Sequence, residues 1–512
     1  MLAAQTTLQT LILPDFTLVQ YYVFAAHSEF VLVLDLEMNR LAAAARAWRP
    51  AGRRLAVHTG ASANLMTSPL WPGAAAPRAA APHAAAPADL QRRALSSGLE
   101  GARPAVTMFS DDEEALREHV ERFSKEVLGP KVAKMDAQES LDKDVIDALF
   151  EQGIMGIEAP GDYGGVGLNF TAACLAVEEI ARVDPAVAVL VDIHNTLLIT
   201  AMMRYGTPEQ KEKYLTRLCK DTCASFCLSE PSSGSDAFAM KTRATQQGGE
   251  WVVTGSKCWI SNAKEAGLFV VFANADPDKG HRGITAFVVE RENPGLTIGK
   301  KEDKLGIRAS STCELTFEDC RVSDSAVLGA VGGGYKMAIE LLNEGRIGIG
   351  AQMVGLARGA FDSALPHLHQ RKQFGTAVAD FQGMQFQYAR AAADIEAARV
   401  LVYNAARLKE CGRPFVAQAA MAKLRATEVA QSVASQCIDW LGGVGFTRGL
   451  PGIVVTTLLI FKRLYYCYMA LLLLYSIIMV ITIINGFTRG LAGMQEGYSC
   501  SDCISGGIIK TL

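Results

Sequence analysis

Apolar residues recur at helical spacing through the first part of the chain that has a regular pattern. Ser110 followed by four acidic residues predicts a helix N-terminus, and Gly129-Pro130 predicts where this first helix ends. The same spacing predicts further helices over 143–152, 169–183, 186–205 and 208–219.

The pattern changes after residue 250. Short runs of β-branched and aromatic residues, separated by Gly, Asn, Asp and Pro, cover 251–254, 257–260, 268–273, 284–289 and 313–317. They predict an antiparallel β block. Helical spacing returns over 335–440, with breaks expected at Pro366 and at 412–414. We therefore expect an α+β multidomain protein: a helical domain (109–222), a middle antiparallel β domain (223–333) and a helical bundle (334–451).

The first 108 residues do not share this pattern and are expected to be disordered. From Met38 the chain is rich in Arg and Ala, and it contains no Asp or Glu between residues 39 and 88. This composition predicts a mitochondrial presequence that begins at Met38 and directs the protein to the matrix, with residues 1–37 as an upstream extension. The alternative is an Ala/Pro-rich tail without a targeting role.

Composition excludes several classes of protein. The net charge of -3 gives no reason to expect nucleic acid as a partner. Twelve cysteines in 512 residues are too few for a disulfide framework. Cys219, Cys223 and Cys227 are best interpreted as small buried residues, and His367 and His369 are too isolated to predict a metal site.

Four polar segments are candidates for chemistry. Residues 226–236 predict a turn-rich loop with backbone donors and hydroxyls that suit a polar ring or phosphate, or an ordinary surface loop. Residues 259–261 place an aromatic plane beside a hydroxyl, although a strand Trp is usually core. Residues 332–335 open a helix that could receive an anion. The segments 371–375 and 442–445 complete the set, and no Gly-rich fingerprint follows a strand, which disfavours a Rossmann site.

In their order and spacing, these motifs resemble the acyl-CoA dehydrogenase family over residues 109–451. The motifs are Ser-Glu-Pro-x-x-Gly-Ser-Asp at 229–236, Trp-Ile-Ser at 259–261, Arg-x-x-Phe-Gly at 371–375 and Gly-Gly-x-Gly at 442–445. Within the family, 343–348 and 308–312 are most similar to members acting on short, 2-methyl-branched acyl-CoA. The resemblance implies a four-helix bundle, a homotetramer and FAD.

Site residues follow from the resemblance by position. It implies that FAD is bound by Phe226, Cys227, Leu228, Ser229, Gly234, Ser235, Trp259, Ile260, Ser261, Arg371, Gln382, Asp439, Trp440, Leu441, Gly442 and Gly443, the last seven across a subunit boundary. It implies that acyl-CoA is contacted by Ser235, Tyr335, Asn343, Glu344, Gly345 and Arg346. The implied reaction is α,β-dehydrogenation of the thioester, in which a carboxylate removes the α proton, hydride passes to the flavin, and an electron-transfer flavoprotein accepts the electrons. The implied pathways are isoleucine and fatty acid catabolism.

The chain departs from the family after Pro451, where the Glu loop that supplies the base is expected. Between Glu428 and Glu496 the only acidic residue is Asp439. Some relatives carry the base at the position of Gly345; Glu344 is one residue away and is expected to contact substrate or solvent. Glu496 echoes the lost loop but comes some thirty residues late. No catalytic residue is therefore assigned, and an impaired enzyme is expected.

Residues 452–512 form an atypical apolar tail. Its uncharged stretch 464–488 is long enough to span a membrane. However, the six residues 445–450 recur at 486–491, which favours a misjoined coding segment. The alternative to an impaired enzyme is thus a non-catalytic flavin- or acyl-CoA-binding protein, or a membrane-tethered one.

Overall fold

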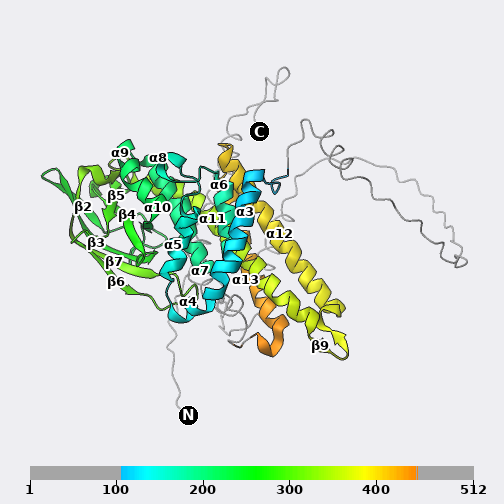
Figure 1. Ribbon diagram of the computed structural model, residues 1–512. Coiled ribbons are helices and arrows are strands. Elements are labelled where there is room, and N and C mark those ends of the chain that lie inside the picture. The colour runs from blue at the N-terminus through cyan, green and yellow to red at the C-terminus, as the bar shows by residue number, and fades with distance from the viewer. Residues whose placement is uncertain (1–104, 446, 448–512) are drawn as a thin grey trace, which may run out of the picture. The chain divides into compact units, whose positions relative to one another are not determined.

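The computed structural model describes residues 105–445 and residue 447 (Figure 1). The predicted presequence, the 464–488 stretch, Glu496 and the second copy of the repeat lie outside these residues.

The N-terminal region of the described chain is helical, as the spacing predicts. Its elements are α3 (Asp111–Phe123), η1 (Ser124–Leu128), η2 (Gly129–Lys131), α4 (Val132–Gln138), α5 (Lys143–Glu151), η3 (Ile154–Gly156), η4 (Gly161–Tyr163), α6 (Phe170–Ala181), α7 (Pro185–Asp192), η5 (Ile193–Ile199), α8 (Thr200–Tyr205), α9 (Pro208–Gln210), η6 (Lys211–Leu215) and α10 (Thr216–Lys220).

The start of α3 is confirmed, but its expected end is wrong. Ser110 caps the helix, and its backbone N–H donates to the Glu113 carboxylate at 2.8 Å, so the two form a capping box. Gly129 and Pro130 do not stop the helix, because they form the 3₁₀ turn η2, which leads directly into α4. Proline is tolerated there because the first turn of a helix leaves its N–H positions unpaired.

The middle region is a mixed sheet of eight strands, β1 (Cys223–Cys227), β2 (Arg243–Gln247), β3 (Glu250–Ser261), β4 (Ala266–Asn274), β5 (Ile284–Glu290), β6 (Leu296–Lys301), β7 (Thr312–Ser323) and β8 (Val327–Leu328). Most strand pairs are antiparallel, as expected. The exceptions are two parallel pairings of β4, with β1 over five residues and with β2 at Arg243 and Asn274. The sequence pattern missed β1, β2, β6 and β8, and it divided β3 into two.

Three long helices follow: α11 (Gly334–Gln370), α12 (Gln382–Glu410) and α13 (Val416–Leu441). The small elements between and after them are β9 (Lys372–Gln373), β10 (Thr376–Ala377), η9 (Val378–Asp380) and η10 (Gly442–Val444), and the sheet region contains two short helices, η7 (Pro277–Gly283) and η8 (Asp324–Ala326). The break at 412–414 is confirmed. The break at Pro366 is not, since α11 continues to Gln370. Pro366 lies in the last turns of α11, and the loss of the one backbone hydrogen bond that a proline cannot donate does not end the helix there.

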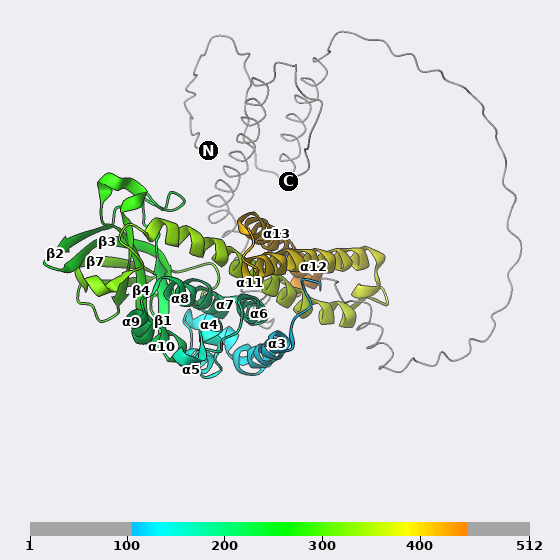
Figure 2. The same cartoon turned by 90° about the horizontal axis from the view of Figure 1, so that it is seen from above.

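α11 connects the sheet to the bundle (Figure 2). Its first turns pack against β5, and its remaining length packs against α13, α12 and α6. The helical segment Pro185–Tyr205 is long and apolar enough to span a membrane by length and composition, but 83% of its most apolar window is buried inside the fold. This segment is therefore a core element of the described region.

Candidate functional site

Two of the predicted FAD-binding segments lie side by side where the strands β1 and β3 end. The backbone N–H of Cys258 donates to the carbonyl of Ser229 at 2.9 Å, and the Ser225 hydroxyl donates to the carbonyl of Ser261 at 2.8 Å. The loop that begins at Ser229 is thus fixed beside the end of β3. Cys227 and Leu228 are buried beneath it, whereas Gly234 and Ser235 are exposed.

Trp259 is presented to solvent by an irregular turn of the backbone. The pairing of β3 with β7 shifts register between Lys257 and Ile260, and Trp259 has φ +59°. Its side chain is 65% exposed, whereas Ile260 is 2% exposed. The expectation that a strand Trp is core is therefore wrong at this position. Such bulges and left-handed non-glycine residues cluster at binding sites, because they aim a side chain away from the sheet.

Tyr335 brings the start of α11 to the same place. Its ring packs on Phe238 with centroids 4.2 Å apart and on His281 at 4.5 Å. Phe238 follows directly from the 229–236 loop. A Cβ on Gly334 would lie 2.9 Å from the carbonyl oxygen of Ile284, so the absence of a side chain lets the helix start reach the sheet. We call the segments 226–238 and 259–261 together with Tyr335 the cradle.

The next predicted segment, 343–346, lies on α11 beyond the cradle. The Arg346 side chain donates to Asn343. Glu344 is 3% exposed, so the expectation that it faces solvent is wrong. Its carboxylate pairs with Arg204 at 2.6 Å and with Lys409 at 3.5 Å. The Glu344 carboxylate is thus held between a cation of α8 and a cation of α12.

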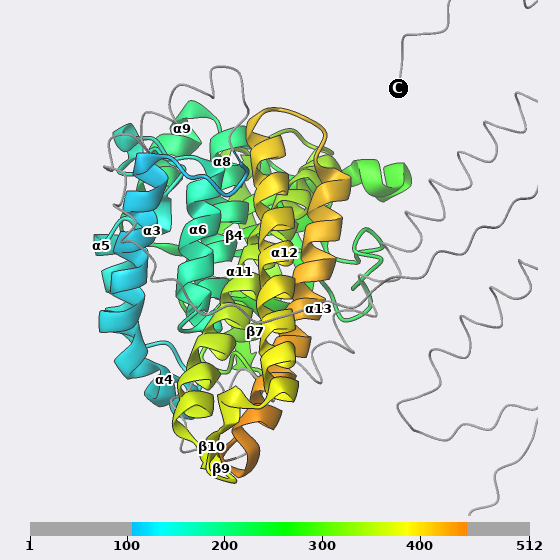
Figure 3. The same cartoon turned by 90° about the vertical axis from the view of Figure 1, so that its right-hand side faces the viewer.

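The remaining predicted residues gather at the other end of the three-helix group. Arg371 ends α11, Gln382 begins α12, and both are exposed. The Trp440 indole N–H donates to the Gln387 side chain at 3.0 Å, which joins the end of α13 to the start of α12. Figure 3 shows the β9–β10 hairpin and the end of α13 at this same end. We call Arg371, Gln382 and 439–443 the bundle-end group.

The cradle and the bundle-end group are far apart within one chain. α11 has 37 residues, so at 1.5 Å per residue its two ends are about 55 Å apart. That distance is far longer than a dinucleotide. The two groups of this chain therefore do not bind the two halves of one FAD molecule.

The cradle fits a flavin ring on the evidence of its own residues. It offers an exposed indole face and, next to it, the hydroxyl of Ser261. Asn262, the residue after Ser261, has a buried Oδ1 without a hydrogen-bond partner among the described residues. An exposed aromatic plane with polar groups nearby suits a heteroaromatic ligand.

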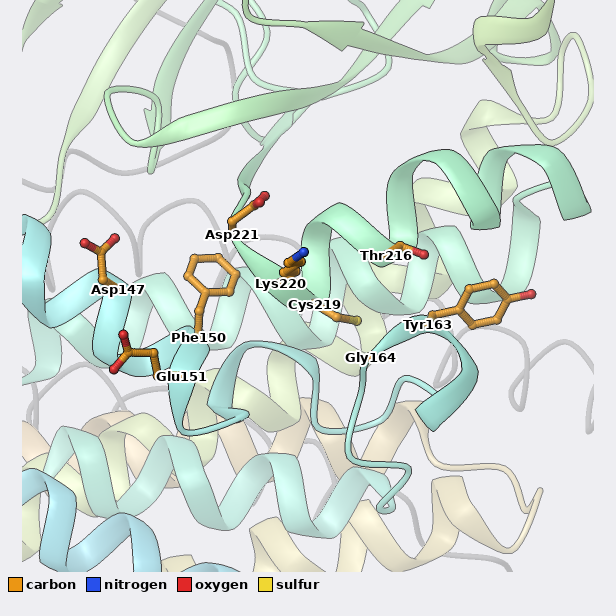
Figure 4. A pocket seen from close by; sticks show the side chains of 9 residues that line it. All are labelled: Asp147, Phe150, Glu151, Tyr163, Gly164, Thr216, Cys219, Lys220 and Asp221. Atoms are coloured by element: carbon orange, nitrogen blue, oxygen red, sulfur yellow. The ribbon is translucent and has the colours of Figure 1, made fainter.

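Figure 4 shows a different cavity, of about 420 Å³, between α5, η4 and α10. It is lined by Asp147, Phe150, Glu151, Tyr163, Gly164, Thr216, Cys219, Lys220 and Asp221. None of these is a predicted FAD or acyl-CoA residue. Burial raises the pKa of the Cys219 thiol to about 11, so this cysteine is protonated at neutral pH. Cys219, Cys223 and Cys227 are all buried, which confirms their interpretation as small core residues.

Sequence reasoning missed the ion pair that lies under the cradle. The ammonium group of Lys257 lies 2.8 Å from the Glu230 carboxylate, with side chains 0% and 3% exposed. Lys257 stands in an apolar strand, where a lysine is rarely buried without a partner. That exception to the strand pattern is the signal that could have revealed the pair.

The family comparison agrees with this geometry. Three family models match the chain: Acyl-CoA dehydrogenase, N-terminal domain at 110–222, middle domain at 225–320 and C-terminal domain at 332–468. Short/branched chain specific acyl-CoA dehydrogenase, mitochondrial, is 52% identical in Rattus norvegicus, over 67% of this chain and 79% of that one. The Bos taurus protein of the same name is 51% identical, over 71% of this chain and 84% of that one.

Solved structures give the same result. A chain from the structure of the electron transferring flavoprotein of Acidaminococcus fermentans is 40% identical with a TM-score of 0.67, over 69% of this chain and 93% of that one. A glutaryl-CoA dehydrogenase from Mycobacterium smegmatis in complex with FADH2 is 29% identical with a TM-score of 0.64, over 69% of this chain and 89% of that one.

These findings define a flavoprotein oxidoreductase that acts on CH–CH bonds. The chain belongs to the acyl-CoA dehydrogenase family. The expected family, the three-part fold and FAD as the family's cofactor are thereby confirmed.

Proposed function

We propose that this chain binds FAD with its flavin ring in the cradle and oxidises short/branched-chain, 2-methyl acyl-CoA at a greatly reduced rate. The observation that carries the proposal is the Trp259 indole, 65% exposed on a strand bulge and fixed beside the Ser229 loop. Bound FAD would supply the hydride acceptor. The residues 226–229, 234–235 and 259–261 would hold and orient it.

The substrate side of the proposal rests on Ser235, Tyr335 and 343–346. Tyr335, at the start of α11, packs against Phe238, which lies three residues after Ser235. A ligand that contacts Ser235 would therefore also lie near the start of α11. The names of the rat and bovine relatives support the short/branched-chain preference. Lys409 and Arg204 hold Glu344 in an ion-paired state, so this residue would shape the substrate site rather than remove a proton.

The reduced rate follows from the missing base. The matching position after Pro451 carries no acidic residue. The two buried carboxylates in the predicted segments 226–236 and 343–346, Glu230 and Glu344, are both held in ion pairs. The loss of a general base typically lowers the rate by about 10²–10⁴-fold.

The bundle-end group supports assembly into a homotetramer. Arg371, Gln382 and 439–443 are about 55 Å from the cradle along α11, so they would serve the FAD of another copy. Phe374, in the hairpin next to Arg371, is 98% exposed, which suits a surface covered by a partner copy.

The similarity to a chain of the Acidaminococcus structure supports an electron-transfer flavoprotein as the electron acceptor. The relatives' names support a mitochondrial location. The matrix, and a role in isoleucine and fatty acid catabolism, are the further parts of this proposal.

A second candidate is a protein that binds flavin and acyl-CoA without turnover, and the same missing base favours it. One experiment separates the two. The purified full chain is loaded with FAD and mixed anaerobically with 2-methylbutanoyl-CoA. Slow bleaching of the flavin band supports the impaired enzyme, whereas a spectral shift without bleaching supports the binding protein. A chain that takes up no FAD contradicts both.

A further inference from the structure

The Lys257–Glu230 ion pair lies at the point where the two segments of the cradle meet. Lys257 is on β3, two residues before Trp259, and Glu230 directly follows Ser229. Both side chains are buried, at 0% and 3% exposure, and Nζ lies 2.8 Å from Oε1. Each partner is therefore next to a residue that the proposed flavin site uses.

The pair also makes hydrogen bonds at both ends of the loop that runs from Leu228 to Thr242. The Lys257 ammonium donates to the carbonyl of Leu228 at 3.0 Å. The Glu230 carboxylate accepts from the backbone N–H of Lys241 at 2.6 Å and from that of Thr242 at 3.1 Å. Two side chains thus connect the start of the loop, its end and the strand that carries Trp259.

Stability alone does not explain this arrangement. Burial lowers the pKa of Lys257, although the Glu230 carboxylate opposes this. Burial also acts to raise the pKa of Glu230, but Lys257 and the backbone donors outweigh it and the pKa is lowered. A buried ion pair can often be replaced by neutral residues of similar volume without loss of stability, so stability does not by itself require charged residues at these two positions.

We propose that Lys257 and Glu230 are positioning residues that hold the Ser229 loop and Trp259 in the arrangement that binds the flavin ring. This inference rests on the proposed flavin site. Neither residue needs to contact the reacting atoms. Their effect on FAD passes through the Leu228 carbonyl and the backbone N–H groups of 241 and 242.

The main test is the double variant Lys257→Met with Glu230→Gln in the full chain. It removes both buried charges at similar volume. Lys241 and Thr242 donate to different oxygens of Glu230, so the Gln carbonyl can accept from one of these backbone N–H groups but not from both. We expect the melting temperature to fall only modestly, because no unpaired charge is left. FAD affinity should fall about tenfold or more, since the loop start loses its charged donor. The absorption bands of the bound flavin should shift.

Glu178→Gln with Arg358→Met is the matched control. It removes two members of an ion-pair network in which Glu178 also pairs with Arg399 and Arg358 also pairs with Glu179, and this network joins α6 to α11 and α12 rather than to the cradle. This control should alter the melting temperature but leave the FAD dissociation constant and the flavin spectrum unchanged. The single variant Lys257→Met provides a second reading if the double variant folds poorly, because Glu230 keeps its two backbone donors, and it should weaken FAD in the same direction.

Three results would overturn the inference. If the double variant binds FAD with the original affinity and spectrum, the pair does not position the cradle, and the proposed flavin site stands. If control and double variant lose FAD affinity in proportion to their loss of stability, the pair is only general structural support. If the unsubstituted chain takes up no FAD, the proposed function fails first and the inference fails with it.

Discussion

The cradle and the bundle-end group differ in how completely one chain builds them. The cradle is closed by contacts within the chain: Ser229 to Cys258, Ser225 to Ser261 and Phe238 to Tyr335. The bundle-end group is open, with Arg371, Gln382 and Asp439 exposed. Under the proposed function, the flavin-ring site would form within a single chain, whereas the remaining FAD contacts would need a second copy.

The proposed impairment can be tested first by placing a carboxylate at Gly345, on α11 beyond the cradle. A Cβ on Gly345 would lie 3.1 Å from the terminal Cδ2 of Leu197, a flexible atom that can move by a few tenths of an ångström. We therefore expect Gly345→Glu to fold. It should raise the rate of flavin reduction by 2-methylbutanoyl-CoA by about 10²–10⁴-fold, measured by anaerobic stopped-flow absorbance.

Gly345→Gln is the control for this experiment, since it has the same size and cannot accept the proton. An equal acceleration by Gln would show that side-chain bulk rather than basicity acts at this position. An unsubstituted chain that already reduces its flavin as fast as Gly345→Glu would contradict the proposed impairment.

An ion pair between α12 and α3 attaches the bundle to the N-terminal helices. Arg407 on α12 donates twice to the Glu113 carboxylate, at 2.6 and 2.7 Å. Burial acts to raise the pKa of Glu113, but the hydrogen bonds from Arg407, Ser110 and Asn169 outweigh it and bring the pKa to about 2.

We expect this anchor to make the helical region sensitive to acid. A carboxyl group with a lowered pKa contributes stability above its ordinary value of 4.5 and loses it as the pH falls toward 2. The contribution is about 3 kcal/mol at neutral pH. Urea unfolding should show Glu113→Gln less stable at pH 7, with the difference closing below pH 4. A constant difference across this range would contradict the anchor.

The sequence pattern predicted most of the helical framework but less of the sheet. Long periodic segments such as 143–152 were found because their apolar spacing depends only on local sequence. The strands β1, β2, β6 and β8 were missed because they are two to six residues long, and β1 and β8 also pair with strands that are distant in the chain. Local sequence also predicted a helix break at Pro366 that does not occur, because packing against neighbouring helices stabilises α11 beyond this proline.

The candidate site was predictable as a list of residues but not as a geometry. The motifs identified Ser229, Trp259 and Tyr335, yet no local signal shows that they converge. The left-handed turn at Trp259 and the separation of Arg371 from Tyr335 follow from the β bulge and from the uninterrupted length of α11, which are tertiary features.

Arg371 tests the open region directly. We expect Arg371→Ala to weaken FAD binding by about tenfold in the assembled protein, because a charged hydrogen bond to the diphosphate half would be lost. The absorption spectrum of the flavin that remains bound should not change, since the cradle is intact. Lys372→Ala, on the same exposed hairpin, is the matched control. Equal losses from both variants would reduce the effect to general surface charge.

Cys411 lies outside both the cradle and the bundle-end group. Among the cysteines of residues 105–445 it alone is exposed, and it follows the end of α12 opposite to Gln382. Burial raises the pKa of several others, including Cys223 and Cys437 to about 12, so these thiols should react slowly with maleimide. Peptide mapping should find Cys411 modified first, with less than about a twofold change in FAD affinity, because α12 places it about 43 Å from Gln382. Cys411→Ser should abolish this fast labelling. A large loss of FAD on labelling would show that the two regions are coupled through α12, contrary to the independence that the comparison implies.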